Sequence, residues 1–201
     1  MLLNYLGMTL DNILDMKKQI GVSKRNVDHK LYMFRRIRKN LPTSASLNVV
    51  KTMILPVLDY GDIIYDVAPK TIKDNLQPLI SNALRTVYWN ENTKNHQKLH
   101  KLADLNLLDD RREMHMLVHS FRASLKIDRI DHRPIRTRAH DERLIKSHRV
   151  KNGAYRKSLL HRTSTVWNRL DVAIRCHKNE TEFKSWLKKE YDKKVKALPN
   201  V

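Results

Sequence analysis

Paired carboxylates are the first residues in this chain whose types could support metal chemistry. Asp109 and Asp110 directly follow two leucines. A carboxylate pair that holds two divalent ions needs a tight hairpin between apolar strands and a third carboxylate from elsewhere. Here Arg111 and Arg112 follow at once, and the pattern beyond them is helical. We therefore predict that the aspartates cap a helix rather than bind metal.

Histidine pairs are the second candidate for metal binding. His115 and His119 are four residues apart, as are His96 and His100, and this spacing allows two ligands on one helix face. The glutamate of a His-Glu-x-x-His site is missing, because Met116 occupies its position. We expect histidines that face solvent or phosphate. The four glycines form no phosphate-binding loop. Together with the incomplete carboxylate and histidine sets, this predicts no catalytic residue, metal or cofactor.

Basic residues are the remaining side chains with chemical potential, since guanidinium and ammonium groups contact phosphates. The predicted nucleic-acid-binding residues are Lys24, Arg25, Arg35, Arg36, Arg38, Lys39, Arg85, Arg111, Arg112, Arg136, Arg138, Arg143, Arg149, Arg156 and Lys157. Four aromatic residues, Tyr88, Trp89, Trp167 and Trp186, could stack on bases. The two later tryptophans fall on apolar helix faces, so we expect them in the core.

The net charge of +19 points to the same class of partner. Residues 61–110 are nearly neutral, whereas residues 111–201 carry 24 Lys or Arg against 10 Asp or Glu. A field of this sign attracts a phosphate backbone. We expect RNA or an RNA–DNA duplex as the partner, bound mostly through phosphates, and no membrane.

The elements that must position these side chains are mainly helices. Few glycines and prolines, 41% hydrophobic residues and helical spacing predict a mainly α protein. We expect a strand over residues 3–11 with a turn at Asp11-Asn12, and a non-helical break between two helices over 62–69. A polar loop is expected over 90–98 and an irregular stretch near 126–155. Helices are expected near residues 16–41, 44–60, 71–87, 99–108 in part, 109–125, 159–170 and 180–191.

Prolines and glycines mark the helix limits. Pro42 should end the first helix, Pro56 should kink the second, and Gly61 should terminate it. Pro78 should kink the third helix or delay its start. Ser44 or Ser46 should cap the second helix. The apolar stripe of the first helix is Met16, Ile20, Val27, Leu31, Phe34, Ile37 and Leu41.

The single cysteine, Cys176, excludes an intramolecular disulfide and a cysteine-based zinc site within the chain. No signal peptide is visible, and the longest apolar run, residues 53–58, is far too short to cross a membrane. These features favour an intracellular protein, nuclear or cytoplasmic.

A series of short landmarks adds a resemblance that spans nearly the whole chain. They are Tyr5-Leu6-Gly7 with Leu10-Asp11, Pro56 with Leu58 and Tyr60-Gly61, Asn82 to Arg85, Leu99-His100, Leu105 to Leu108, Arg111-Arg112, Trp167 to Leu170, Ile174-Arg175 and Phe183-Lys184. In order and spacing they resemble the C-terminal part of reverse transcriptases from Jockey-like non-long-terminal-repeat retrotransposons. Asp171 and Pro78 depart from the family pattern, and its catalytic Tyr/Phe-x-Asp-Asp would lie upstream of the match.

The resemblance implies a domain order and a role. Residues 1–14 would be the last strand of a polymerase palm, residues 15–108 a helical thumb, and residues 109–201 a basic helical C-terminal region. The chain would then grip template–primer or element RNA without catalysing synthesis, and the palm and fingers would be a further partner. The alternative is a stand-alone helical protein-interaction module derived from a retroelement.

Overall fold

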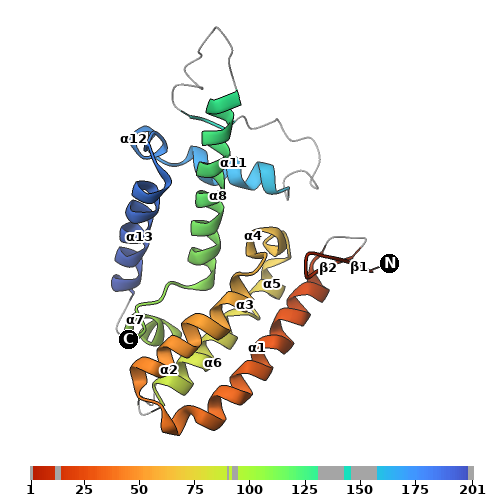
Figure 1. The fold of residues 1–201 in the computed structure, drawn as a ribbon, viewed down its shortest axis with the longest axis vertical. Helices are drawn as coiled ribbons and strands as arrows, with labels where there is room; N and C mark the ends of the chain where they lie inside the picture. The colour runs from red at the N-terminus through yellow and green to blue at the C-terminus, as the bar shows by residue number, and fades with distance from the viewer. Residues whose placement is uncertain are drawn as a thin grey trace. The chain divides into compact units, whose positions relative to one another are not determined.

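The computed structural model describes residues 2–11, 15–89, 91, 95–130, 143–145 and 158–198 (Figure 1). It is mainly helical with one short hairpin, which confirms the predicted fold class. The chain forms two compact units, one of residues 1–109 with 192–201 and one of residues 110–191. None of the described helices combines the length and the apolar character needed to cross a bilayer.

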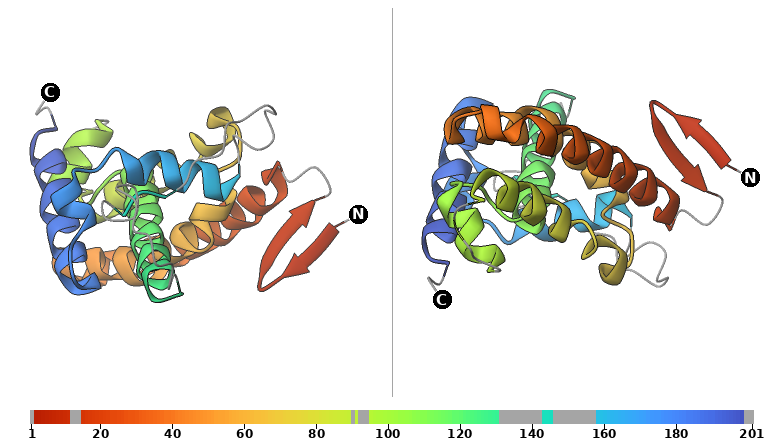
Figure 2. Two further views of the ribbon diagram at one scale, coloured as in Figure 1. Left: turned by 90° about the horizontal axis from the view of Figure 1, so that it is seen from above. Right: turned by 90° about the horizontal axis from the view of Figure 1, so that it is seen from below.

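The N-terminal segment is a hairpin. Strands β1 (Leu2–Tyr5) and β2 (Met8–Asp11) pair antiparallel, with Tyr5 opposite Met8, and the hairpin lies beside the first turns of α1 (Figure 2). Leu6 and Gly7, with φ of 48° and 77°, form the two-residue turn. The prediction of one strand over 3–11 was wrong because a leucine rarely adopts positive φ, so Leu6 gave no turn signal.

Helix α1 (Lys17–Ile37) continues into the 3₁₀ turn η1 (Arg38–Asn40) and ends before Pro42, as predicted. Its core side follows the predicted apolar stripe through Ile20, Val27, Leu31 and Phe34. Ile37 is 49% exposed, contrary to the prediction, and lies at one edge of the apolar stripe around the helix.

The second helical segment is interrupted where proline removes a backbone donor. Helix α2 (Thr43–Val49) passes through a π-helical turn, η2 (Val50–Ile54), into α3 (Leu55–Asp59). Pro56 lies just after the π turn, so the predicted irregularity is present. The predicted serine cap is wrong, since α2 begins at Thr43 without a side-chain cap. Gly61, with φ of 68°, ends the segment as expected.

Short helices follow, one of them where the sequence predicted a break. They are α4 (Asp62–Tyr65), α5 (Lys70–Lys73), α6 (Gln77–Val87) and α7 (His96–Leu102). Pro78 lies in the first turn of α6, which is the predicted late start. Helix α7 begins inside the expected 90–98 loop because the Asn95 side chain accepts from the N–H groups of Gln97 and Lys98.

The core of this first unit lies where α1 packs against α3 and α6, with α2 and α7 against α6 (Figure 1). Its fully buried side chains include Val27, Val50, Ile54, Leu76, Ile80, Leu84 and Leu99. One face of α1 is therefore fixed on the core, and its remaining circumference is available for other contacts.

The second unit is built by α8 (Leu108–Ile130), α11 (Leu159–Asn168), α12 (Val172–Arg175) and α13 (Glu180–Lys196). Helix α8 begins at Leu108, so Asp109 and Asp110 lie in its first turn rather than capping it. Helix α8 also covers residues 126–130, the start of the stretch predicted to be irregular. Phe121 stacks on Phe183 at 4.5 Å between ring centroids, and buried Trp167 meets the Phe121 ring edge-on, which confirms Trp167 as core.

Candidate nucleic-acid interface

A strip of cations runs along the exposed side of α1. Lys24, Arg25, Arg35 and Arg36 were predicted to contact phosphates, and all four are exposed, as is Lys18. At about 100° per residue, the five positions fall within an arc of about 120°. We call this set the basic strip. Lys18 was missed by the sequence analysis, although its position seven residues before Arg25 places it on the same helix face.

The basic strip is short of neutralising acids. Asp28 is the only acidic residue within α1. Among the described residues, none forms an ion pair with Lys18, Lys24, Arg25, Arg35 or Arg36. The Arg36 guanidinium lies 5.9 Å from the centre of the exposed Tyr32 ring, a cation–π contact that leaves its charge intact. The strip is therefore free to interact with an external polyanion.

A basic hollow opens at the N-terminal end of the strip. It has a volume of about 420 Å³ and is lined by Lys17, Lys18, Gly21, Val22 and Arg25, with Thr9 of β2. Lys17 pairs with Asp15 at 3.1 Å, so Lys18 and Arg25 supply the uncompensated charge. A Cβ on Gly21 would lie 4.0 Å from Arg25 Nη1, so this glycine leaves space beside the guanidinium. The charge of this lining suits an anionic group such as a phosphate, and the volume leaves room for more than the phosphate itself.

Arg38 belongs to the same basic run in the sequence but is only 9% exposed. Its guanidinium donates to Thr86 O at 2.9 Å, Leu41 O at 2.7 Å and Val87 O at 2.5 Å. Thr86 and Val87 are the last residues of α6, where carbonyls lack helical partners. The predicted phosphate contact at Arg38 is therefore replaced by an internal one, whereas Lys39 is exposed next to it.

The other predicted residues lie outside α1 in the sequence. Arg85, half-buried on α6, donates to Asn82 Oδ1 at 2.7 Å. Arg111 is half-buried and Arg112 is buried. Arg143 Nη1 donates to His177 O at 2.7 Å, and its own carbonyl accepts from Trp167 Nε1 at 2.7 Å, which ties it to the second unit's core. Arg136, Arg138, Arg149, Arg156 and Lys157 lie outside the described residues.

His100 corrects the expectation of solvent-facing histidines. It is fully buried, its Nδ1 lies 2.9 Å from Leu105 O, and its Nε2 lies 2.8 Å from Gln77 Nε2. Burial lowers the pKa of His100, since the charged imidazolium is disfavoured away from water. Both ring nitrogens are engaged inside the unit, so His100 links α7 to α6 rather than offering a metal ligand.

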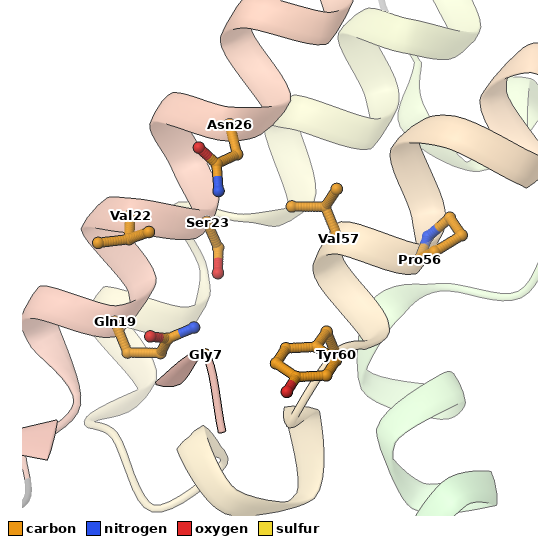
Figure 3. A pocket seen from close by; sticks show the side chains of 8 residues that line it. All are labelled: Gly7, Gln19, Val22, Ser23, Asn26, Pro56, Val57 and Tyr60. Atoms are coloured by element: carbon orange, nitrogen blue, oxygen red, sulfur yellow. The ribbon is translucent and has the colours of Figure 1, made fainter. Parts of the chain in front are cut away.

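A second hollow lies on the neighbouring side of α1. Its volume is about 280 Å³. Figure 3 shows Gln19, Ser23 and Asn26 projecting from α1 toward a space bounded on the other side by Val57 and Tyr60. We call it the amide hollow. Sequence reasoning missed it, although Gln19 and Ser23 are polar residues spaced by four beside the apolar stripe.

The comparisons with known proteins identify no relative for this chain. Neither a protein-family model, nor a curated protein, nor a solved structure matches it.

Proposed function

We propose that this chain grips an RNA or RNA–DNA duplex through its phosphates, as the thumb and C-terminal part of a retrotransposon reverse transcriptase. The observation that carries the proposal is the basic strip, with five exposed cations and no ion-pair partner among the described residues. The landmark series supplies the family, and the positive charge of residues 111–201 adds to the attraction. We assign no catalytic step to the chain, because the family's Tyr/Phe-x-Asp-Asp does not occur in the 201 residues.

The dimensions of the basic strip suit a duplex. From Lys18 to Arg36 the helix rises by about 27 Å at 1.5 Å per residue. At the charge spacing of B-form DNA, a duplex segment of that length carries roughly 16 phosphate charges. Ammonium and guanidinium groups on one helix face contact phosphates without reading base edges, so the binding is independent of sequence.

Salt dependence provides the test. If five cations of the basic strip each neutralise one phosphate, they contribute about −4.5 to the slope of log K against log salt concentration. We expect Arg25→Gln combined with Arg36→Gln to make that slope shallower by about 1.8 for a 20-base-pair RNA duplex, measured by fluorescence anisotropy.

The matched control is Lys51→Gln combined with Lys70→Gln, which removes the same charge from exposed positions outside α1. It should change the slope by less than about 0.5, since neither lysine belongs to the strip. The proposal would be contradicted by equal slopes of log K against log salt concentration for the two double variants. It would also be contradicted by a duplex affinity that does not change with salt concentration.

A second candidate function, a protein-interaction module, is favoured by an apolar hollow of about 250 Å³ whose lining includes the exposed side chains of Met33, Ile37 and Met53. An apolar surface of this kind marks a docking site when it is extensive. Sedimentation velocity over a range of concentrations tests self-association through it. A monomer at every concentration would count against that form of the candidate.

A further inference from the structure

The amide hollow contains polar side chains that the chain itself does not satisfy. Gln19 and Ser23 are each only 3% exposed. Thr9 N donates to Gln19 Oε1 at 2.8 Å, which pairs the oxygen of the side-chain amide. The NH₂ group is the remaining polar group of that amide. Among the described residues, neither that NH₂ nor the Ser23 hydroxyl has a hydrogen-bond partner. Neither atom is among the fully enclosed polar atoms that lack a partner, so both keep accessible surface and can bond to water or to an occupant of the hollow.

Ser23 lacks the hydrogen bond that several hydroxyl residues in the helices make, as does Ser46 of α2. Thr52, Ser81 and Ser120 each donate to the carbonyl oxygen four residues earlier. This back-bond is the usual way in which a helical serine or threonine satisfies its hydroxyl. Because Ser23 makes no such bond in the structure, its hydroxyl is available to a group inside the hollow.

The walls of the hollow define what kind of group that would be. Gln19 and Asn26 present amides and Ser23 a hydroxyl on one side, and the Tyr60 ring and Val57 present flat or apolar surface on the other (Figure 3). Tyr60 is held in place by donating its hydroxyl to Leu6 O. A volume of about 280 Å³ is at the small end for ligand sites. Amides beside an aromatic ring recognise the edge and the face of an unpaired nucleobase.

The amide hollow also adjoins the basic hollow. Val22 lines both of them, so they open on the two sides of one residue of α1. Around the axis of α1, Lys18 and Arg25 lie on one side of Val22, and Gln19 and Asn26 lie on the other. A nucleotide has the same division, with an anionic phosphate joined to a planar, hydrogen-bonding base.

We infer that the amide hollow binds one unpaired nucleobase next to the duplex, while Lys18 and Arg25 hold its phosphate. This inference rests on the proposed function and adds a specificity to it: the chain would prefer a duplex that carries an unpaired nucleotide. Gln19 Nε2 and Ser23 Oγ donate to acceptors on the base edge, Asn26 offers a donor and an acceptor, and Tyr60 stacks on the base.

The test compares three RNA probes on the full chain. They are a blunt 20-base-pair duplex, the same duplex with a single-nucleotide bulge, and the bulged duplex with an abasic residue at the bulge. Base stacking on an aromatic side chain predicts binding on the order of tenfold tighter for the bulged probe than for the other two. The abasic probe keeps the phosphate, so it separates the base from the backbone.

A double variant locates the effect. Ser23→Ala combined with Asn26→Ala should remove the preference for the bulge and leave the affinity for the blunt duplex unchanged. Ser44→Ala combined with Asn48→Ala, which changes the same residue types at exposed positions of α2, should keep it. Thermal melting followed by circular dichroism verifies that both variants fold. A 2-aminopurine at the bulge should be quenched on binding, since the base stacks on Tyr60.

The two proposals fail differently. If all three probes bind equally with a steep salt dependence, the nucleobase site is overturned and the proposed duplex binding remains. The same conclusion follows if the double variant keeps the preference for the bulge. If the blunt duplex does not bind even at low salt, the proposed function is overturned, and the nucleobase inference falls with it.

Discussion

Arg38 provides a sharp test of how this chain uses its basic residues. Its neighbours Arg35, Arg36 and Lys39 are exposed, whereas Arg38 reaches the C-terminal carbonyls of α6. We expect Arg38→Met, which keeps most of the aliphatic stem, to lower the free energy of unfolding by about 3 kcal/mol. This magnitude follows from three lost hydrogen bonds at about 1 kcal/mol each. The three carbonyl oxygens must then find other donors.

A second variant separates charge from geometry. Arg38→Lys keeps the positive charge, but a single ammonium nitrogen does not reproduce the planar fork that reaches three acceptors. We therefore expect Arg38→Lys to lower the free energy of unfolding by about 2 kcal/mol, which is less than the loss expected for Arg38→Met. If charge alone mattered, Arg38→Lys would be as stable as wild type.

Urea unfolding followed by circular dichroism measures both losses, with Arg36→Met as the matched control on the same helix. An exposed position without buried partners should change stability by less than about 0.5 kcal/mol. Duplex binding should show the reverse order, with Arg36→Met weakened and Arg38→Met unaffected under folding conditions. A stable Arg38→Met that binds RNA poorly would refute this assignment.

Two further predictions concern the turn after α3 and an ion-pair cluster. Gly61→Ala should lower the unfolding free energy by about 1–2 kcal/mol in urea titrations, because φ is 68° and the added Cβ would overlap Met8 Sδ. Bonds from Arg122 and then Lys184 lower the pKa of Glu180 from 4.5 to about 2. This cluster should therefore stabilise the fold above about pH 4.5 and lose its contribution as the pH falls toward 2, which NMR titration of the Glu180 carboxyl checks. Arg122→Ala should raise that midpoint, and a midpoint near 4.5 in wild type would contradict the prediction.

Apolar periodicity predicted much of the fold because the spacing of apolar residues along a helix is set by residues that are near one another in the sequence. The stripe through Ile20, Val27, Leu31 and Phe34 faces the core, and the late start of α6 follows from Pro78. The hairpin was missed since its turn depends on a leucine with positive φ, which local preference disfavours.

The candidate site shows the limit of local patterns more clearly. Arg36 and Arg38 are two residues apart and equally basic, yet one is exposed and the other is buried. The difference is made by Thr86 and Val87, 48 and 49 residues further along the chain. No spacing rule within α1 contains that information. A basic run therefore predicts the sign of the partner's charge, but the folded chain decides which side chains meet it.

Helix α1 brings the two proposed contacts together through its geometry. Around its axis, the basic strip ends near Lys18 and Arg36, and Val22 and then Asn26 follow at steps of about 40°. Gln19 and Ser23 come next, where the helix surface turns into the core. A phosphate bound by Lys18 and Arg25 would therefore lie next to the amide hollow, since Val22 lines both hollows. Phosphate contacts alone would bind any duplex, so it is the hollow that would give this surface a preference for an unpaired nucleotide.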